Sequence, residues 1–277
     1  EIGLPKTILE MPEDTEVLVL ELAMRGLGEI SFLSKTSNPD IGIITNVGTA
    51  HIGKLGSVEN IIKAKCELLE HIKKDGIAIL HNNAKLLEYV KNIWTGKTVT
   101  FDQSQIKKSF YKDGITHFSF LEEDFSINAI GRVYILDSII AILVAKELNM
   151  KKEEIQKGLS EFSVPTGRGN VLNLGEKIFL INETYNANPD SVKEAILNLK
   201  ESFDASFDKV FVLGELAELG EHENILLEDI GKSLLKADLL NVITIGEKLK
   251  QVNLILGNKV KNVKNAEECC KILSGFI

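Results

Sequence analysis

Three side chains in the first quarter of the sequence could together serve phosphate chemistry: Glu21, His51 and Lys65. Lys65 falls within an apolar stripe on a predicted helix at 57–73, which begins after Ser57 as a plausible N-cap. A buried ammonium group is costly, so this lysine either extends its amine to solvent, the commoner case, or has a function. The predicted opposite, solvent-facing side carries the remaining charged residues, Glu59, Lys63, Glu67, Glu70 and Lys73.

Two apolar runs lead toward the carboxylate and the imidazole. Residues 41–44 predict a buried strand of a parallel sheet with His51 beyond its end, and residues 17–20 predict a second strand that delivers Glu21. Residues beyond the carboxyl ends of parallel strands line the ligand crevice of an open α/β fold. We therefore expect the three groups to converge there, the alternatives being a surface carboxylate and a satisfied core histidine.

Composition limits the class of protein. The 277 residues, 44% hydrophobic and 26% charged, suit a globular chain of two domains. No apolar run approaches a membrane span, and residues 1–5 lack a basic signal region, so we expect a cytoplasmic protein without a membrane span. A net charge of −8 argues against a nucleic-acid partner, and three cysteines without a Cys-x-x-Cys pair argue against a zinc site or disulfide framework.

Strand and helix patterns alternate as in an α/β fold. In the predicted first domain, 1–164, we expect strands at 17–20, 41–47 and 77–80, and helices at 28–35, 57–73, 83–93, 135–148 and 153–162. The β-like pieces at 98–101 and 115–120 predict an antiparallel edge or small subsheet. After a hinge at 165–169, the second domain, 165–277, has predicted strands at 178–181, 210–213 and 240–245 and helices at 189–200, 225–236, from 247, and 266–273.

A nucleotide phosphate loop, Gly-x-x-x-x-Gly-Lys-[Ser/Thr], is expected between a strand and a helix. Two partial matches fail this test. Residues 91–98 begin with Lys91 and run into a β-like segment, and residues 226–233 lie inside a predicted helix.

Five motifs resemble the Mur ligase family. The segments 21–30, 45–51 and 64–67 are similar to the family's central domain. The segments 184–191 (Thr-Tyr-Asn-Ala-Asn-Pro-Asp-Ser) and 213–221 resemble the member that joins D-alanyl-D-alanine to UDP-MurNAc-tripeptide. The resemblance covers nearly the whole chain. It implies a mostly parallel open sheet in the central domain and a Rossmann-like α/β C-terminal domain.

In that family the phosphate loop lies upstream of the equivalent of Glu1, behind a further N-terminal domain. We therefore expect the sequence to be part of a longer protein, with a truncated C-terminal domain and no turnover by itself. The implied whole protein is a cytoplasmic, monomeric ligase of peptidoglycan precursor synthesis. By the resemblance, ATP phosphorylates a tripeptide carboxylate, and the dipeptide amine attacks the acyl phosphate.

The resemblance also implies a ligand set. Glu21 would hold the Mg²⁺ shared with the ATP phosphates, and His51 would hold a second Mg²⁺. Lys65 resembles a lysine that becomes carbamylated and thereby turns from a cation into an anionic oxygen ligand.

Further positions carry over from the family by motif. Arg168, Glu183, Asp137 and Asn46 would bind the nucleotide, although the family usually has Asp where this chain has Glu183. Tyr185, Asn186 and Asn188 would lie near the incoming dipeptide, and Asn188 is equally explained as a helix N-cap. The family's adenine-binding amides are replaced here by Val133, Tyr134 and Asp137, of which Asp137 can still accept a hydrogen bond from the adenine amino group.

Two other hypotheses remain open at this stage. The chain could belong to another amide-forming ligase, of the folylpolyglutamate synthase or cyanophycin synthetase type, although the 184–191 motif argues against it. It could also be a non-catalytic binding module that kept the fold, although retention of Glu21, His51 and Lys65 argues against that.

Overall fold

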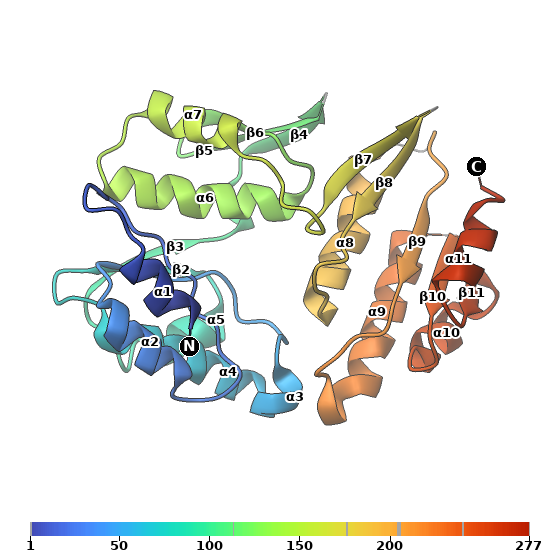
Figure 1. Ribbon diagram of the computed structural model, residues 1–277, viewed down its shortest axis with the longest axis horizontal. Helices are drawn as coiled ribbons and strands as arrows, with labels where there is room; N and C mark the ends of the chain where they lie inside the picture. Colours follow the sequence, from blue (N-terminus) through green and yellow to red (C-terminus); the bar gives the residue numbers. More distant parts are fainter. Residues whose placement is uncertain (1, 113, 176, 204–205, 240, 277) are drawn as a thin grey trace. The chain divides into compact units, whose positions relative to one another are not determined.

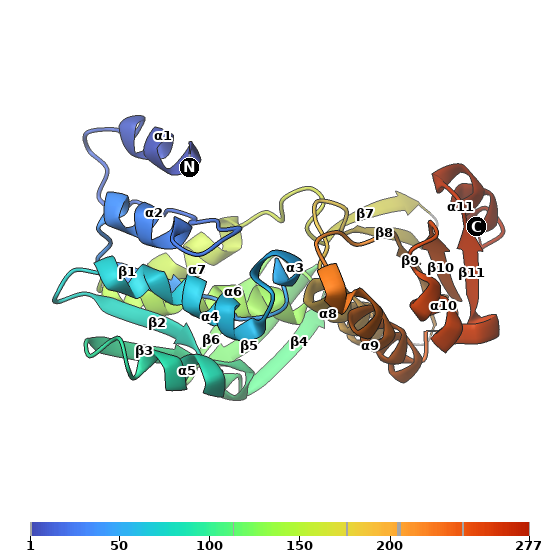
Figure 2. The same ribbon diagram turned by 90° about the horizontal axis from the view of Figure 1, so that it is seen from below.

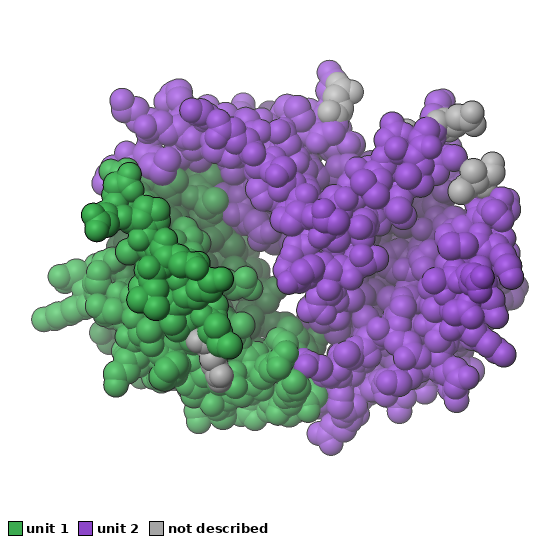
Figure 3. Space-filling model, viewed as in Figure 1, with its two compact units in different colours: residues 1–105, 140–148 green, residues 106–139, 149–277 purple. Residues whose placement is uncertain are grey.

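The computed structural model describes residues 2–112, 114–175, 177–203, 206–239 and 241–276. The chain divides into two compact units, residues 1–105 with 140–148, and residues 106–139 with 149–277 (Figure 3). Each unit contains parallel strands connected by helices (Figure 1), which confirms the predicted α/β class. The domain boundary at 164/165 is a sequence-based division and stays a prediction. In the described part of the chain, no helix has the length and apolar character needed to cross a bilayer.

The first unit is built on a parallel sheet in the order β1-β2-β3. Ile41 pairs with Ile77, and Ile77 pairs with Lys97. The antiparallel arrangement predicted for 98–101 is therefore wrong. The strands are β1 (Ile41–Ile44), β2 (Ile77–His81) and β3 (Lys97–Phe101), and the helices are α1 (Gly3–Leu9), α2 (Glu29–Ser37), α3 (Ile52–Leu55), α4 (Val58–Cys66), the 3₁₀ turns η1 (Glu67–His71) and η2 (Gln103–Gln105), and α5 (Ala84–Val90).

The strand predicted at 17–20 is absent. None of the described strands pairs with this segment, and Val17 and Val19 are 53% and 82% exposed. Strand-like composition forms a strand only where a neighbour accepts and donates the backbone hydrogen bonds. Glu21 therefore does not follow a strand of the sheet.

The predicted helix at 57–73 is divided into α4 and the tighter η1. Ser57 caps α4 by accepting a hydrogen bond from the Asn60 backbone N–H at 3.1 Å, as predicted. A Cβ at Gly42 would lie 2.4 Å from Ile72, so β1 and the end of η1 are packed too closely for a side chain there. Cys66 is buried, and burial raises the pKa of its thiol to about 12, so this residue packs in the core and is not activated as a nucleophile.

The second unit begins with an antiparallel sheet, β4 (Lys108–Lys112), β5 (Ile115–Phe120) and β6 (Glu123–Ile127). The subsheet predicted at 115–120 is thus confirmed. One face carries Phe118, Phe120 and Phe125, all nearly inaccessible to solvent. The helix α7 (Lys152–Glu161) lies against β6, and α6 (Arg132–Glu147) starts within this unit.

The C-terminal part has a parallel sheet in the order β11-β10-β9 with helices on both faces (Figure 2). Ile243 packs with Cys269 of α11, while Thr244, on the other face, donates to Asn253 of α10. This is the predicted Rossmann-like arrangement. Its elements are β9 (Val210–Leu213), β10 (Asn241–Ile245), β11 (Val260–Val263), α8 (Pro189–Ser202), α9 (Glu223–Ala237), α10 (Lys250–Leu256), α11 (Ala266–Leu273), η3 (Gly220–His222) and η4 (Gly257–Lys259). Leu240, predicted to begin β10, lies outside the described residues.

Two strands that follow the predicted hinge, β7 (Asn170–Gly175) and β11, were not predicted from the sequence. The predicted strand at 178–181 is present as β8 (Ile178–Asn182), and it forms an antiparallel pair with β7. The partner of β8 is thus a segment whose own composition did not predict a strand.

Candidate functional site

Lys65 lies in the last turn of α4 and is half-buried. Its Nζ donates a hydrogen bond to the backbone carbonyl of Asn46 at 2.7 Å. Burial lowers the pKa of this amine, because the surrounding protein disfavours the charged form. Asn46 follows β1 by two residues, so two predicted site residues meet just beyond the carboxyl end of a buried parallel strand.

His51 and Glu21 occupy less regular backbone. His51 is the N-cap of α3, half-buried, with a left-handed backbone at φ 63°. Glu21 is exposed in the segment between residue 17 and α2. The convergence of Glu21, His51 and Lys65 on one crevice stays a prediction.

Among the described residues, no group of three or more His, Cys, Asp or Glu side chains could hold a metal ion. A nucleotide-bound Mg²⁺ needs less, since one or two carboxylates combine with phosphate and water oxygens. The carboxylate of Glu21 suits that role. An imidazole such as that of His51 is a less suitable ligand for a cation that prefers oxygen.

A second cluster forms around Tyr134 in the second unit. The Tyr134 hydroxyl donates to the backbone carbonyl of Arg168, and the Arg168 guanidinium lies 4.1 Å from the centre of the Tyr185 ring. A Cβ at Gly169 would lie 2.9 Å from the Glu183 carboxylate, so the turn packs directly on this side chain. The predicted positions Arg168, Glu183 and Tyr185 are thus neighbours.

Three groups of this cluster have raised pKa values. Burial, with the nearby carboxylates of Glu183 and Asp137, raises the pKa of Tyr134 to about 12. Desolvation raises the pKa of both carboxyl groups, although each residue as a whole remains exposed. Acidic groups repel phosphate but accept hydrogen bonds from amino groups, so the cluster fits a base or ribose better than a triphosphate.

Asn188 is confirmed as the N-cap of α8. Its side-chain oxygen accepts hydrogen bonds from the backbone N–H groups of Asp190 and Ser191, both at 3.0 Å. Asn186 accepts from the Ala187 backbone N–H at 2.9 Å and is exposed. Contact of these amides with a dipeptide stays a prediction.

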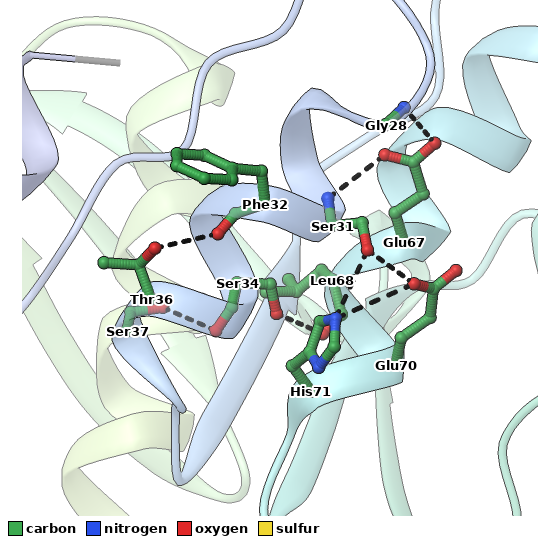
Figure 4. Close-up of polar contacts among 10 residues, drawn as sticks. All are labelled: Gly28, Ser31, Phe32, Ser34, Thr36, Ser37, Glu67, Leu68, Glu70 and His71. Atoms are coloured by element: carbon green, nitrogen blue, oxygen red, sulfur yellow. Dashed lines mark hydrogen bonds and ion pairs between the residues drawn. The ribbon is translucent and has the colours of Figure 1, made fainter.

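Two carboxylates with structural roles were missed or misassigned from the sequence. Glu67, predicted to face solvent, is 8% exposed and accepts backbone hydrogen bonds from Gly28, the N-cap of α2, and from Ser31 (Figure 4). Glu215 accepts from the backbone N–H groups of Glu247 and Lys248 at 2.8 and 3.0 Å, and these bonds lower its pKa. The motif at 213–221 pointed to this loop without indicating its partner.

Ser31, Glu70 and His71 form a further polar group between α2 and η1 (Figure 4). Glu70 accepts from the Ser31 hydroxyl at 2.7 Å and lies 3.9 Å from Nε2 of His71, the ring nitrogen that faces Ser31 at 3.2 Å. A hydrolase triad places its acid on the other ring nitrogen, so this group is not one.

Comparison with known proteins identifies related chains. Residues 1–145 match the Mur ligase middle domain, and residues 167–273 match the Mur ligase, glutamate ligase domain. UDP-N-acetylmuramoyl-tripeptide--D-alanyl-D-alanine ligase of Bacillus subtilis is 35% identical over 250 residues, covering 89% of this chain and 54% of that protein. The Escherichia coli protein of the same name is 25% identical over 268 residues, covering 93% of this chain and 59% of that protein.

Solved structures give the same result. A crystal structure of MurF from Acinetobacter baumannii superposes with a TM-score of 0.89 at 26% identity, covering 99% of this chain and 61% of that chain. MurF ligase from Thermotoga maritima in complex with ADP gives 0.86 at 26% identity, covering 99% and 64%. The chain therefore spans between one half and two thirds of the length of these relatives.

Proposed function

Because the chain belongs to the Mur ligase family, we propose that the protein carrying it is an ATP-dependent ligase that joins D-alanyl-D-alanine to UDP-MurNAc-tripeptide. The names of its relatives in Bacillus subtilis and Escherichia coli support this substrate pair. Within the structure, the supporting observation is the half-buried Lys65 amine on the Asn46 carbonyl, beyond the end of β1. The product is a peptidoglycan precursor made in the cytoplasm.

The proposed reaction has two steps. The γ-phosphoryl group of ATP passes to the tripeptide carboxylate, which releases ADP and leaves an acyl phosphate. The dipeptide amine then attacks the carbonyl carbon, phosphate leaves with the electrons of the C–O bond, and the attacking nitrogen loses a proton. Both steps bring anions or lone pairs against a charged phosphate, so catalysis depends on positioning and charge neutralisation.

Glu21 and His51 are the proposed protein ligands for two Mg²⁺ ions. When bound, Mg²⁺ neutralises phosphate charge and polarises the reacting oxygens. Glu21 provides the oxygen donor that this cation favours, and its exposed position leaves room for phosphate and water ligands.

Lys65 is the proposed site of carbamylation. In this reaction a neutral amine forms an N–C bond to CO₂ and releases a proton, and the lowered pKa of Lys65 favours the neutral amine. Native intact-mass measurement in bicarbonate should show one added CO₂, and a Lys65→Arg variant should not show it. An unchanged wild-type mass would exclude the modification and leave Lys65 as an amine.

The remaining assignments concern nucleotide, dipeptide and assembly. Arg168, Glu183, Asp137 and Asn46 would bind ATP, and Tyr185, Asn186 and Asn188 would bind the incoming dipeptide. The clustering of Arg168, Glu183 and Tyr185 around Tyr134 supports a common site for these three residues. The proposed domains are 1–164 and 165–277, and the proposed protein is a monomer, which sedimentation analysis would test.

The decisive experiment measures phosphate release by the complete protein. Release should require ATP, UDP-MurNAc-tripeptide and D-alanyl-D-alanine together, and mass spectrometry should find the joined product. A Lys65→Ala variant should lose the activity. Turnover with folate and glutamate instead would indicate another amide ligase, and nucleotide binding without turnover would indicate a binding module.

A further inference from the structure

Glu67 is a buried carboxylate without a role in the proposed chemistry. It begins η1, directly after α4, and is 8% exposed. Its Oε1 accepts the Gly28 backbone N–H at 2.7 Å, and its Oε2 accepts the Ser31 N–H at 3.1 Å (Figure 4). These donors belong to the N-terminus of α2, where free N–H groups and the helix dipole favour a negative charge. Both oxygens are therefore satisfied, which makes burial of the charge tolerable.

This contact connects two chain segments that each carry a proposed site residue, Glu21 and Lys65. Gly28, with a left-handed backbone at φ 87°, ends the segment 21–28 that starts with Glu21. The same segment is fixed by buried Met24 and by the Arg25 N–H, which donates to Glu29 at 2.6 Å. On the other side, Glu67 follows Lys65 by two residues along a continuous helical path. The Glu67 carboxylate thus joins the Glu21 segment to the helix that carries Lys65.

Three other polar contacts between α2 and η1 lie within the body of α2. Ser34 donates to the Leu68 carbonyl at 2.9 Å, Ser31 donates to Glu70 at 2.7 Å, and the Ser31 hydroxyl lies 3.2 Å from Nε2 of His71. These contacts hold the body of α2 against η1. The Gly28 contact differs because it acts on the backbone in front of the helix (Figure 4).

We propose that Glu67 is a positioning residue for the ligase reaction, which holds the Glu21 segment in a fixed place relative to Lys65. The proposal rests on the function proposed above, in which Glu21 holds a nucleotide-bound Mg²⁺. A residue of this kind acts on metal affinity and on the order of the segment without contacting substrate.

The test compares two isosteric variants of the complete protein. Glu67→Gln keeps the shape but turns an NH₂ group toward one of the two N–H donors, so one bond and the charge are lost. The Mg²⁺ concentration for half-maximal rate should rise about 10-fold to 100-fold, as for other outer partners of metal sites. Glu70→Gln makes the same chemical change on the same turn without touching Gly28, and should leave this Mg²⁺ concentration unchanged.

A second measurement does not depend on activity. Hydrogen exchange of peptides covering 21–28 should accelerate in Glu67→Gln and remain unchanged in Glu70→Gln, because only the first change replaces the charged acceptor shared by the Gly28 and Ser31 N–H groups. Exchange in β1 should be unaffected in both. If Glu67→Gln lowers the thermal midpoint yet keeps wild-type Mg²⁺ dependence and exchange, Glu67 is structural only and the proposal fails.

Two further variants separate this proposal from the proposed function. If Glu21→Gln retains wild-type Mg²⁺ dependence, the metal role of Glu21 is wrong whatever Glu67 does. If Glu21→Gln is impaired but Glu67→Gln is not, only the positioning role is wrong. Should Glu67→Gln fail to fold, Glu67→Asp replaces it. Its shorter carboxylate reaches one donor at most, so an unchanged Mg²⁺ dependence and exchange rate would overturn the proposal.

Discussion

Burial disfavours the charged form of the Lys65 amine. A Lys65→Met variant tests how much this buried charge lowers the stability of the folded protein. Because burial lowers the pKa, the folded protein is penalised for the charged amine below the folded-state pKa, and the penalty vanishes as pH rises toward the ordinary value of 10.5. The methionine side chain would remove the charge and fill the same apolar surroundings. The variant should therefore be as stable as wild type or more stable at pH 7.

Activity should move in the opposite direction. Since substitution of outer partners already costs about 10-fold to 100-fold, loss of Lys65 itself should cost more than about 100-fold in turnover. Denaturant unfolding and phosphate release of the same samples check both expectations. Lys63→Met, an exposed neighbour, is the matched control and should change neither. Lower stability at pH 7 in the Lys65 variant would mean that the amine is a structural group.

The sequence correctly placed Lys65 within the apolar stripe of its helix and wrongly placed Glu67 in solvent. Both results have the same physical reason. Helical periodicity correctly gives the stripe that packs on the sheet, with Ile61 and Ile62 buried. It then implies solvent on the opposite side, but α2 covers the turn there and buries Glu67. Periodicity within one helix cannot show which second helix packs on its polar side, and the buried partners of Glu67 are backbone groups without a residue signature.

At the scale of an element, variants at the N-cap of α8 can distinguish a structural role of Asn188 from a role in binding substrate. Its side chain accepts two backbone N–H groups, so Asn188→Ala should destabilise α8 by about 1 kcal/mol, within a range of about 0.5–2. Asn188→Ser keeps a good cap and should keep the stability. If Asn188 also contacts the dipeptide, the Ser variant should raise the KM for D-alanyl-D-alanine while unfolding as wild type. An unchanged KM would leave the cap as its whole role.

Glu215, in the loop after β9, accepts hydrogen bonds from the loop after β10, and this contact predicts a strict requirement for glycine at position 246. Gly246 has a left-handed backbone at φ 106°, and a Cβ there would lie 2.4 Å from the Glu215 carboxylate that binds the following N–H groups. Gly246→Ala should destabilise this region by about 1–3 kcal/mol, from backbone strain and displacement of the carboxylate. Hydrogen exchange across 241–256 measures it. Gly214→Ala, with open space around its Cβ, should stay near wild type.

The fold was predictable where a segment has its own apolar periodicity and caps. It was less predictable where a segment becomes a strand only by pairing with a neighbour. The helix 266–273 and the strands at 41–44 and 210–213 follow from apolar periodicity and caps, and the structure has them. Residues 17–20 have an equally strong strand composition, yet no described strand pairs with them. Conversely, Val260–Val263 includes Lys261 and Asn262, and it forms a strand because β10 lies beside it. Strand formation is a property of two segments, and one segment alone cannot predict it.

At the scale of the whole molecule, the family matches and the packing assign residues 106–139 to different parts of the chain. The family matches end one domain at residue 145 and begin the next at 167, whereas packing groups residues 106–139 with the C-terminal part. Within that unit Tyr134 donates to the Arg168 carbonyl, and the backbone N–H of Arg132 donates to Asn198 at 3.2 Å. The Tyr134 contact holds the predicted hinge at 165–169 through its Arg168 carbonyl. Whether the segment behaves as a hinge therefore depends on how firmly Tyr134 holds it.

Limited proteolysis with trypsin tests this, because Arg168 is itself a cleavage site within the turn. Its carbonyl is held by Tyr134 and its side chain stacks on Tyr185, so cleavage requires local opening. With a pKa of about 12, the Tyr134 hydroxyl stays protonated and can donate at neutral pH. Tyr134→Phe removes one hydrogen bond worth about 1 kcal/mol, so the open population and the cleavage rate after Arg168 should rise about fivefold.

Tyr89→Phe, which changes a half-buried tyrosine of α5 in the other unit, is the control and should leave cleavage at this bond unchanged. The comparison uses the rate of the cut after Arg168, identified by fragment mass, at low trypsin so that reclosing outpaces cleavage. Equal rates in wild type and Tyr134→Phe would mean that the turn opens without breaking the Tyr134 contact. In that case the Tyr134 contact does not limit opening of the segment 165–169.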